Sequence, residues 1–203
     1  MTQISTRPRK ERKENADKRR RQLLDAARRS IIANGLARTT LATVSEQAGL
    51  SQGVAIFYYK SKNGLLTAVL EDLYQAYQDH WRAALQAAGP NPSQQIEALL
   101  EADFAPEVCN PDILSVWFAF WGEQKFTPQY AAITERFDRA RADALQDVFA
   151  RLGHATARAE DLANWMDGLT DGYWQKLHLF PEHEPHADAH ASALRFLRHM
   201  LGG

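Results

Sequence analysis

The chain has 203 residues, of which 45% are hydrophobic and 24% charged, a composition typical of one or two globular domains with a substantial core. The net charge of −1 hides an asymmetry: residues 1–62 hold 14 Lys and Arg against 5 Asp and Glu, whereas the remainder holds 10 against 20. Because the basic part also carries a turn motif, the charge predicts a polyanionic partner in preference to a merely solvated run of charges.

Three features argue against secreted and membrane-bound classes. Only one cysteine is present, Cys109, so no intramolecular disulfide can form. The first 22 residues are polar and charged and contain no apolar signal segment. The longest apolar run, residues 116–121, is far too short to span a bilayer. We therefore expect a cytoplasmic protein that does not enter a membrane.

The opening segment, residues 1–17, is highly charged and shows no periodicity, which predicts a disordered basic arm. Such an arm can add contacts with DNA or serve only to keep the protein soluble, and the sequence leaves both roles open. Helical periodicity begins at about residue 18, and the first predicted helix ends at Gly35.

Residues 39–62 predict two short helices joined by a glycine turn, the layout of a helix-turn-helix. Thr40 is a suitable N-cap for the first helix, Gly49 supplies the positive φ that ends it, and Ser51 caps the second. The second helix, over residues 52–58, is expected to enter the major groove of DNA.

The two faces of this second helix are predicted to differ. One face should bury Val54 and either Phe57 or Tyr58. The other should present side chains small enough to lie against base-pair edges: Gln52, Gly53 and Ala55.

The remainder of the chain predicts only helices, with no alternating strand pattern and no internal repeat. Six are expected, over residues 62–88, 93–104, 112–123, 127–151, 157–179 and 185–201. The fold class is therefore all-α with about nine helices. We expect a three-helix DNA-binding domain over residues 18–62 and an α-helical ligand-binding and dimerisation domain over residues 63–203.

The first part resembles the DNA-binding domain of TetR-type repressors. The resemblance rests on the A-G-L-S turn, the aromatic end Tyr58-Tyr59, and the K-N-G-L-L segment that begins at Lys62. It implies that four residues approach bases or backbone, namely Ser51, Gln52, Gly53 and Phe57, and that three bind phosphates, namely Thr40, Tyr58 and Lys62. Core packing is the alternative role for Phe57.

Helical spacing in the second part gathers aromatic and acidic side chains. Trp117 and Trp121 share one face of a short helix, and Asp167, Asp171 and Trp174 share one face of a later helix. Two carboxylates beside a tryptophan on a largely buried helix are costly without a positive partner, and a quaternary ammonium ligand between Trp faces would supply one. The alternative is a plain aromatic core, with the two acids bonded to arginines: Arg136, Arg139 or Arg141.

The segments V-W-F-A-F-W (residues 116–121) and L-T-D-G-Y-W (residues 169–174) are similar to the regulatory domain of the choline-responsive TetR-type repressors of glycine-betaine synthesis genes. Phe104 and residues 136–141 fall where those proteins have similar residues, and the resemblance adds Phe104 to the proposed ligand site. The sequence departs from them at Tyr173, at Gln175 and over residues 177–183. The resemblance implies a repressor of osmoprotectant genes that choline or a related cation releases from DNA.

Other site types receive less support. His183, His186 and His190, with Asp188, have the spacing of metal ligands but are better explained as a surface cluster. No catalytic or cofactor-binding signature occurs, so we expect neither enzyme activity nor a metal or cofactor. Three further alternatives stay open. They are a TetR-type repressor that responds to another small or hydrophobic molecule, a helical enzyme or carrier with a degenerate DNA-binding part, and a constitutive DNA-binding protein without a ligand.

A homodimer is expected, held by the last two long helices. Five leucines are available for its interface: Leu162, Leu169, Leu194, Leu197 and Leu201. Ligand binding would tilt the helix over residues 62–88, so that the two DNA-binding domains no longer match the half-site spacing of the operator.

Overall fold

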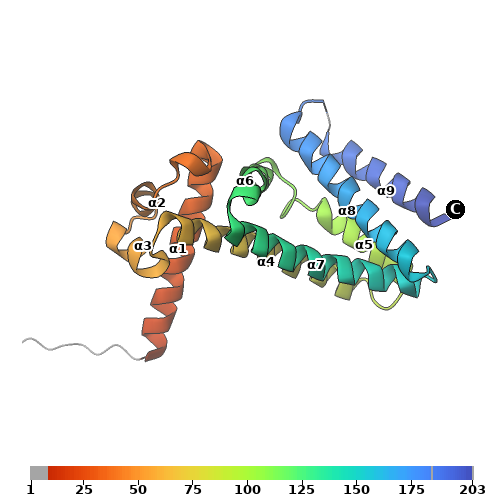
Figure 1. Cartoon of the computed structure of the whole chain (residues 1–203), viewed down its shortest axis with the longest axis horizontal. Coiled ribbons are helices and arrows are strands. Elements are labelled where there is room, and N and C mark those ends of the chain that lie inside the picture. The colour runs from red at the N-terminus through yellow and green to blue at the C-terminus, as the bar shows by residue number, and fades with distance from the viewer. Residues whose placement is uncertain (1–8, 184, 203) are drawn as a thin grey trace, which may run out of the picture. The chain divides into compact units, whose positions relative to one another are not determined.

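A computed structural model describes residues 9–183 and 185–202, with side chains from Lys13 to Leu201. Over these ranges the chain forms nine α-helices and one 3₁₀ turn without any strand, which confirms the all-α prediction (Figure 1). The elements are α1 Arg9–Arg38, α2 Leu41–Gln47, α3 Gln52–Tyr59, α4 Lys62–Ala87, α5 Pro92–Asp103, α6 Pro111–Glu123, η1 Gln124–Phe126, α7 Pro128–Arg151, α8 Thr156–Leu179 and α9 His186–Gly202.

The chain divides into two compact units, Met1–Leu70 and Glu71–Gly203. The predicted boundary after residue 62 falls at the first residue of α4, whereas the units divide within this helix. The continuous backbone of α4 therefore links the two units.

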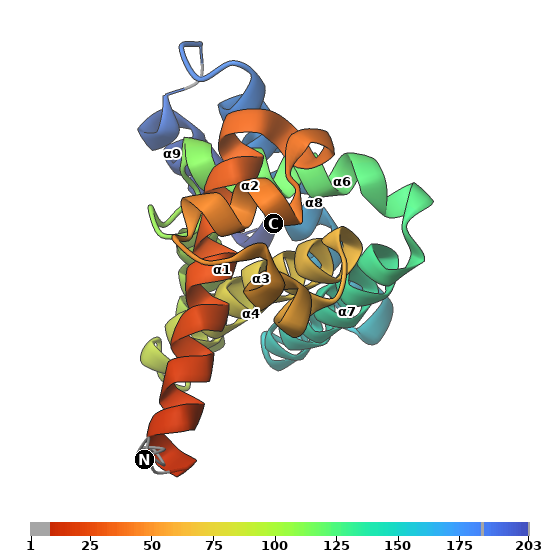
Figure 2. The ribbon, with the colours of Figure 1, turned by 90° about the vertical axis from the view of Figure 1, so that its left-hand side faces the viewer.

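Helix α1 begins at Arg9, well before the predicted start at about residue 18. The expectation of disorder is wrong for residues 9–17, and residues 1–8 lie outside the described part of the chain. Arg, Lys and Glu, which dominate this stretch, are good helix formers, so a polar composition does not prevent a helix that continues one already packed on a core. Figure 2 shows the N-terminal end of α1 projecting beyond α2 and α3 within the first unit. Gly35, with φ of 74°, interrupts the helix near its end.

The helix-turn-helix is built by local hydrogen bonds. The Thr40 hydroxyl accepts from the backbone N–H of Thr43, and the Thr43 hydroxyl accepts from the N–H of Thr40, so the pair forms a capping box at the start of α2. Gly49 has the predicted positive φ, 64°. Ser51 occupies the N-cap position of α3, but its side chain makes no capping hydrogen bond there.

In the second unit, α7 and α8 form the most extensive helix pair, and α5 packs against α7, α8 and α9. Asparagine side chains cap two of the helices: Asn91 accepts from Ser93 N–H at the start of α5, and Asn110 accepts from Ile113 N–H at the start of α6. The core is apolar and fully buried at its centre, with Leu100, Phe120 and Phe149 all at 0% exposure. Cys109 belongs to this core.

Candidate functional site

The recognition helix α3 exposes different side chains from those predicted. Ala55 is fully buried and faces the unit's own core, so it is not available to a base edge. Phe57 is 67% exposed and Ile56 is 44% exposed, which rules out core packing for Phe57. Gln52 and Gly53 are exposed, as the sequence predicts. A helix this short has room for one small buried residue on its inner side, and Ala55 takes that place.

Aromatic side chains at the end of α3 attach it to α1. The Arg20 guanidinium lies 5.2 Å from the centre of the Tyr58 ring, and the Tyr59 hydroxyl donates to the Arg20 carbonyl oxygen at 3.1 Å. Lys60 ends the helix with φ of 66°, and its ammonium group donates to the Phe57 carbonyl oxygen. Tyr58, which is assigned to DNA, therefore contacts α1, and its neighbour Tyr59 is hydrogen-bonded to α1.

The phosphate-binding role expected for Lys62 competes with a structural contact. Its Nζ donates to the Ala37 carbonyl oxygen at 2.7 Å, near the end of α1. Thr40, assigned the same role, is exposed and caps α2. Both side chains thus lie where helix α1 ends and helix α2 begins.

Positive charge in the first unit is concentrated on α1. Residues 9–38 contain 11 of the 14 Lys and Arg found in residues 1–62, together with 4 acidic residues. The stretch from Leu41 to Tyr59, which covers α2, the turn and α3, contains one charged residue, Glu46. The attraction of this unit for a polyanion therefore originates mainly in α1.

The second unit contains a cavity of about 330 Å³. Five of the six residues predicted for the ligand site line it, namely Trp117, Trp121, Asp167, Asp171 and Trp174. Its other lining residues are Tyr74, Tyr77, Gln124, Thr134, Asp138, Arg141 and Thr170. The walls therefore come from α4, α6, η1, α7 and α8.

The aromatic rings of the cavity form a connected set. Trp117 lies 4.6 Å from Tyr74 and 6.1 Å from Trp174, measured between ring centres. Trp121 lies 6.5 Å from Trp117, and Tyr77 lies 5.6 Å from Trp174. Trp117 and Trp174 are nearly fully buried, at 2% and 3% exposure. Several ring faces and edges thus border one small space.

Phe104, the sixth predicted residue, does not line the cavity. It is 2% exposed and packs against Tyr173, His186 and His190, with ring centres 5.4 to 6.0 Å apart. The prediction for Phe104 is therefore wrong, whereas the preceding residue, Asp103, belongs to the network described next.

A buried ionic network lies against the cavity. Arg141 donates to Asp103 Oδ2 at 2.7 Å and to Asp167 Oδ1 at 3.0 Å. Thr170 also donates to Asp103 Oδ2, the Tyr77 hydroxyl donates to Asp103 Oδ1 at 2.7 Å, and the Trp174 indole N–H donates to the Asp103 carbonyl oxygen. Asp103 is fully buried, and this burial raises the pKa of its carboxyl group, while Arg141 and the hydrogen bonds oppose the rise. The network fixes the position of Trp174 and of one of the two predicted acids.

The two predicted acids therefore differ. Asp167 is paired with Arg141, one of the partners that the aromatic-core alternative named. Asp171 has neither an ion pair nor a hydrogen bond from any residue in the described ranges, although solvent reaches it. Desolvation, followed by the charges of Asp167, Asp138 and Asp103, raises the pKa of Asp171 to about 7. The cavity thus keeps one predicted carboxylate without a cationic partner.

Asp138 is a second such carboxylate, and sequence analysis did not single it out. It lines the cavity from α7, and within the described part of the chain it forms no ion pair or hydrogen bond. Although the Asp138 side chain is exposed to solvent, partial desolvation by the surrounding cavity wall, followed by the charge of Asp167, raises its pKa to about 6. In the sequence, the only indication of a role for Asp138 was its place in the segment 136–141, which includes Arg141 and resembles the choline-responsive repressors. Asp103 and Tyr74 carried no comparable signal, because their roles depend on contacts with distant residues.

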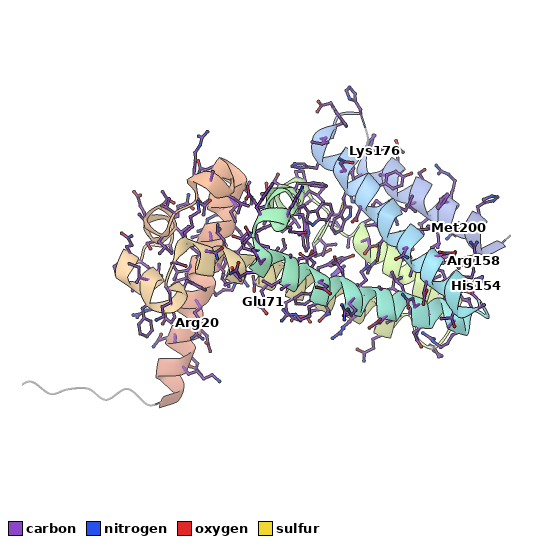
Figure 3. The ribbon with its side chains drawn as sticks, in the orientation of Figure 1. Arg20, Glu71, His154, Arg158, Lys176 and Met200 are labelled. Carbon is purple, nitrogen blue, oxygen red and sulfur yellow. The ribbon has the colours of Figure 1, made fainter. Side chains whose placement is uncertain are left out.

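The predicted dimer helices expose some of the expected side chains and bury others. Leu162 and Leu197 are fully buried inside the unit, so they cannot contribute to an interface between subunits. Leu169, Leu194 and Leu201 are half-buried. Trp165 on α8 and Phe196 on α9 are 46% and 45% exposed, and Arg158, near the start of α8 in Figure 3, lies 4.6 Å above the Trp165 ring.

Metal binding and membrane insertion find no structural counterpart in the described ranges. His186 and His190 pack on Phe104, and no group of three or more His, Cys, Asp or Glu residues with the arrangement of a metal site occurs there. No described helix is both long enough and apolar enough to cross a bilayer.

Comparison with known families decides the classification. Residues 23–69 match the model for bacterial regulatory proteins of the tetR family, and residues 92–202 match the model for the C-terminal part of BetI-type transcriptional repressors. The chain belongs to the TetR family. It is a DNA-binding transcriptional repressor and not an enzyme, as the sequence predicts.

Individual relatives agree with this assignment. The HTH-type transcriptional regulator BetI of Paraburkholderia xenovorans is 35% identical over 161 residues, which cover 77% of this chain and 80% of that protein. BetI of Stenotrophomonas maltophilia is 32% identical over 154 residues, covering 74% and 79% of the two chains. Members of the TetR family bind operator DNA, dimerise and respond to small-molecule effectors.

Solved structures share the fold. A transcriptional regulator from Pseudomonas aeruginosa PAO1 superimposes with a TM-score of 0.82 at 21% identity, over 92% of each chain. A transcriptional regulator from Saccharomonospora viridis, solved in complex with choline, gives a TM-score of 0.76 at 20% identity, over 90% of this chain and 97% of that one.

Proposed function

We propose that this TetR-family repressor is released from its operator by choline or a closely related quaternary ammonium compound, and that it controls osmoprotectant genes for glycine betaine. The supporting observation is the aromatic cavity with the unpaired carboxylate of Asp171. A trimethylammonium group fits such a site because its charge attracts both the carboxylate and the ring faces, while its methyl groups need no hydrogen bonds. The choline complex of the Saccharomonospora viridis regulator, which has the same fold, agrees with this proposal.

The aromatic walls are assigned to Trp117, Trp121 and Trp174, and the counter-charge to Asp171. Asp167 acts indirectly, because Arg141 already neutralises it. Phe104 supports the cavity from behind. Tyr74 and Tyr77 add aromatic surface from α4, the helix that continues into the DNA-binding unit. A change in the position of these two tyrosines on ligand binding would therefore act on α4 directly.

On the DNA side, the proposal assigns base readout to the exposed start of α3, where Gln52 and Gly53 lie, with Ser51 and Phe57 close to base or backbone. Tyr58, Thr40 and Lys62 are assigned to phosphates. The small and uncharged character of this surface suits close approach to the edges of bases.

Dimerisation is assigned to the exposed sides of α8 and α9. The proposed contact residues are Leu169, Leu194 and Leu201, which the sequence suggested, together with Trp165 and Phe196, which it did not. A two-fold interface of this kind buries the same patch on both subunits.

The test is a titration with a matched pair of ligands. Choline and its neutral isostere 3,3-dimethylbutanol are added to the protein, binding is followed by tryptophan fluorescence, and release from the upstream DNA is followed by gel shift. Choline should bind and release the DNA, whereas the isostere should bind more weakly, because it lacks the charge.

Trp121→Ala is the most informative variant, since Trp121 is half-buried and outside the ionic network. Loss of one cation–π face should weaken choline binding by roughly twofold to thirtyfold, from about 0.5–2 kcal/mol per face, with DNA binding in the absence of ligand unchanged. Trp174→Ala is less suitable, because Trp174 also donates to Asp103. The absence of a saturable choline response at millimolar concentration in the wild type would refute the proposal.

A further inference from the structure

The cavity contains more hydrogen-bonding capacity than a trimethylammonium group can use. Trp117 Nε1, Gln124 Nε2, Thr134 Oγ1 and Arg141 Nη1 are buried, and none meets the geometry of a hydrogen bond with any described residue. All four residues line this one cavity. Three of these groups can only donate, so the site lacks an acceptor that a ligand oxygen would provide.

Two of these residues gather at one end of the cavity, beside Asp138. Thr134 and Asp138 are one turn apart on α7 and so lie on the same face. Burial and the charge of Asp138 raise the pKa of the Tyr74 hydroxyl, whereas hydrogen-bonding groups of Thr134, Trp121 and Gln124 oppose the rise. Thr134 and Gln124 therefore lie near the Tyr74 hydroxyl, although Thr134 Oγ1 and Gln124 Nε2 do not reach hydrogen-bond geometry with it. Trp117 contacts both Tyr74 at this end and Trp174, next to which the ammonium group is assigned.

We infer that Gln124, Thr134 and Asp138 form a subsite for the oxygen end of the effector, in which Asp138 selects a quaternary ammonium alcohol and rejects the corresponding carboxylate. An alcohol oxygen accepts from Gln124 or Thr134, and its O–H donates to the Asp138 carboxylate. This inference rests on the proposed function and adds that the polar group of the effector is an alcohol.

Charge explains why a carboxylate is rejected. Four acids lie in or against the cavity, Asp103, Asp138, Asp167 and Asp171, and Arg141 is the one basic residue among the lining and network residues in the described ranges. Choline adds a positive charge and an alcohol to this site. Glycine betaine, the zwitterion that results from oxidation of choline, adds a carboxylate that the acids of the cavity repel and that has no proton to donate to Asp138. The repressor would therefore respond to the precursor and ignore the product.

The experiment is calorimetric titration of the full-length protein with three quaternary ammonium compounds at pH 8. They are choline, its methyl ether (2-methoxyethyl)trimethylammonium, which keeps the charge but has no O–H, and glycine betaine. The wild type should bind choline at least about tenfold tighter than the ether and at least about a hundredfold tighter than betaine.

Asp138→Asn should reduce both preferences about tenfold, because the amide is uncharged and can itself donate to an oxygen. Asp143→Asn is the matched control: Asp143 is exposed on the same helix, does not line the cavity, and should leave both ratios unchanged. Thr134→Val should weaken choline more than it weakens tetramethylammonium, which has no oxygen.

The outcomes separate the two proposals. If choline binds but Asp138→Asn leaves both ratios at the wild-type values, the oxygen subsite is wrong and the choline response stands. If the wild type binds betaine as tightly as choline, the selection by Asp138 is wrong. If the wild type binds none of the three compounds, the proposed function itself fails.

Discussion

The two units of this repressor place their key side chains in opposite surroundings. On α3 the proposed reading surface is exposed and almost uncharged, and each residue acts through its local position on one short helix. Around the cavity, buried aromatic rings and the buried pair of Asp103 and Arg141 adjoin two exposed carboxylates, Asp138 and Asp171, and the lining groups come from five different elements. A surface that must fit DNA can be altered residue by residue, whereas a buried ionic site depends on every partner at once.

The largest expected effect is a loss of stability, and it tests the contrast between the buried ionic network and an exposed ion pair. Arg141→Met removes the cationic partner of Asp103 while keeping most of the volume, and leaves a fully buried carboxylate without its cation. We expect the free energy of unfolding to fall by about 3–5 kcal/mol, measured by urea denaturation. Arg139→Met is the control, since Arg139 pairs with Glu135 on the exposed side of the same helix, and it should cost less than about 1 kcal/mol. Equal losses would show that the buried network does not differ from a surface pair.

The second prediction concerns the dimer. Leu169→Arg puts a charge without a partner into the proposed contact between subunits, so the dimer should dissociate at micromolar concentration in sedimentation velocity experiments. Asp143→Arg, on the exposed side of α7, should sediment as the wild type does. A wild-type protein that is monomeric at this concentration would overturn the assignment of α8 and α9.

The third prediction is a pH dependence of effector binding. With its pKa raised from 3.8 to about 7, Asp171 is protonated in the empty cavity below neutral pH, and a cation must displace that proton. Choline affinity should fall about tenfold from pH 8 to pH 6, and the folded protein should lose stability as pH rises from about 4 to 7, because only the folded state retains the proton.

The groups that face Asp171 are Asp103 from α5, Asp138 and Arg141 from α7, and Asp167 from α8 itself. Asp138 titrates near pH 6, so it contributes to the lower end of the curve. Asp171→Asn should flatten most of the pH dependence above pH 6.5. A profile that stays as steep in this variant would place the titrating group elsewhere.

The smallest effects are expected on the DNA side. Gln52→Ala should change which operator bases are tolerated, at about 1–3 kcal/mol for a lost base contact. Lys62→Ala should weaken binding to all sequences alike and reduce the salt slope by about one, if Lys62 exchanges the Ala37 carbonyl for a phosphate. Titrations of operator DNA and of altered sequences, followed by fluorescence anisotropy at several salt concentrations, separate a change in base preference from a change in salt slope. A change of base preference in Lys62→Ala, with an unchanged slope, would contradict the docking.

Local sequence signals predicted the parts of the molecule that depend on neighbours in the chain. The Thr40 cap and the Gly49 turn follow from residues within one turn of each feature, and the structure confirms them. The helix starts predicted at residues 93, 112 and 127 each lie one residue from the observed starts at Pro92, Pro111 and Pro128. The same reasoning failed on the inner face of α3, because periodicity over eight residues does not decide which of Ala55 and Phe57 faces the core.

The cavity was predicted only in part, for a physical reason. Spacing along one helix placed Trp117 with Trp121, and Asp171 with Trp174. It could not place Asp103 against Arg141 and Thr170, which are 38 and 67 residues away along the chain. Only the packing of α5, α7 and α8 shows that Asp167 already has a cation and that Asp171 does not.

The distribution of charge in the DNA-binding unit separates finding the operator from reading it. Helix α1 holds 11 of the 14 basic residues in residues 1–62, whereas α2, the turn and α3 hold none. Long-range attraction, which acts on every stretch of duplex alike, governs how fast the repressor arrives and how it moves along a chromosome. Lower ionic strength should therefore raise the rate at which the repressor finds its operator without changing which sequence it prefers, since the side chains that read the sequence carry no net charge.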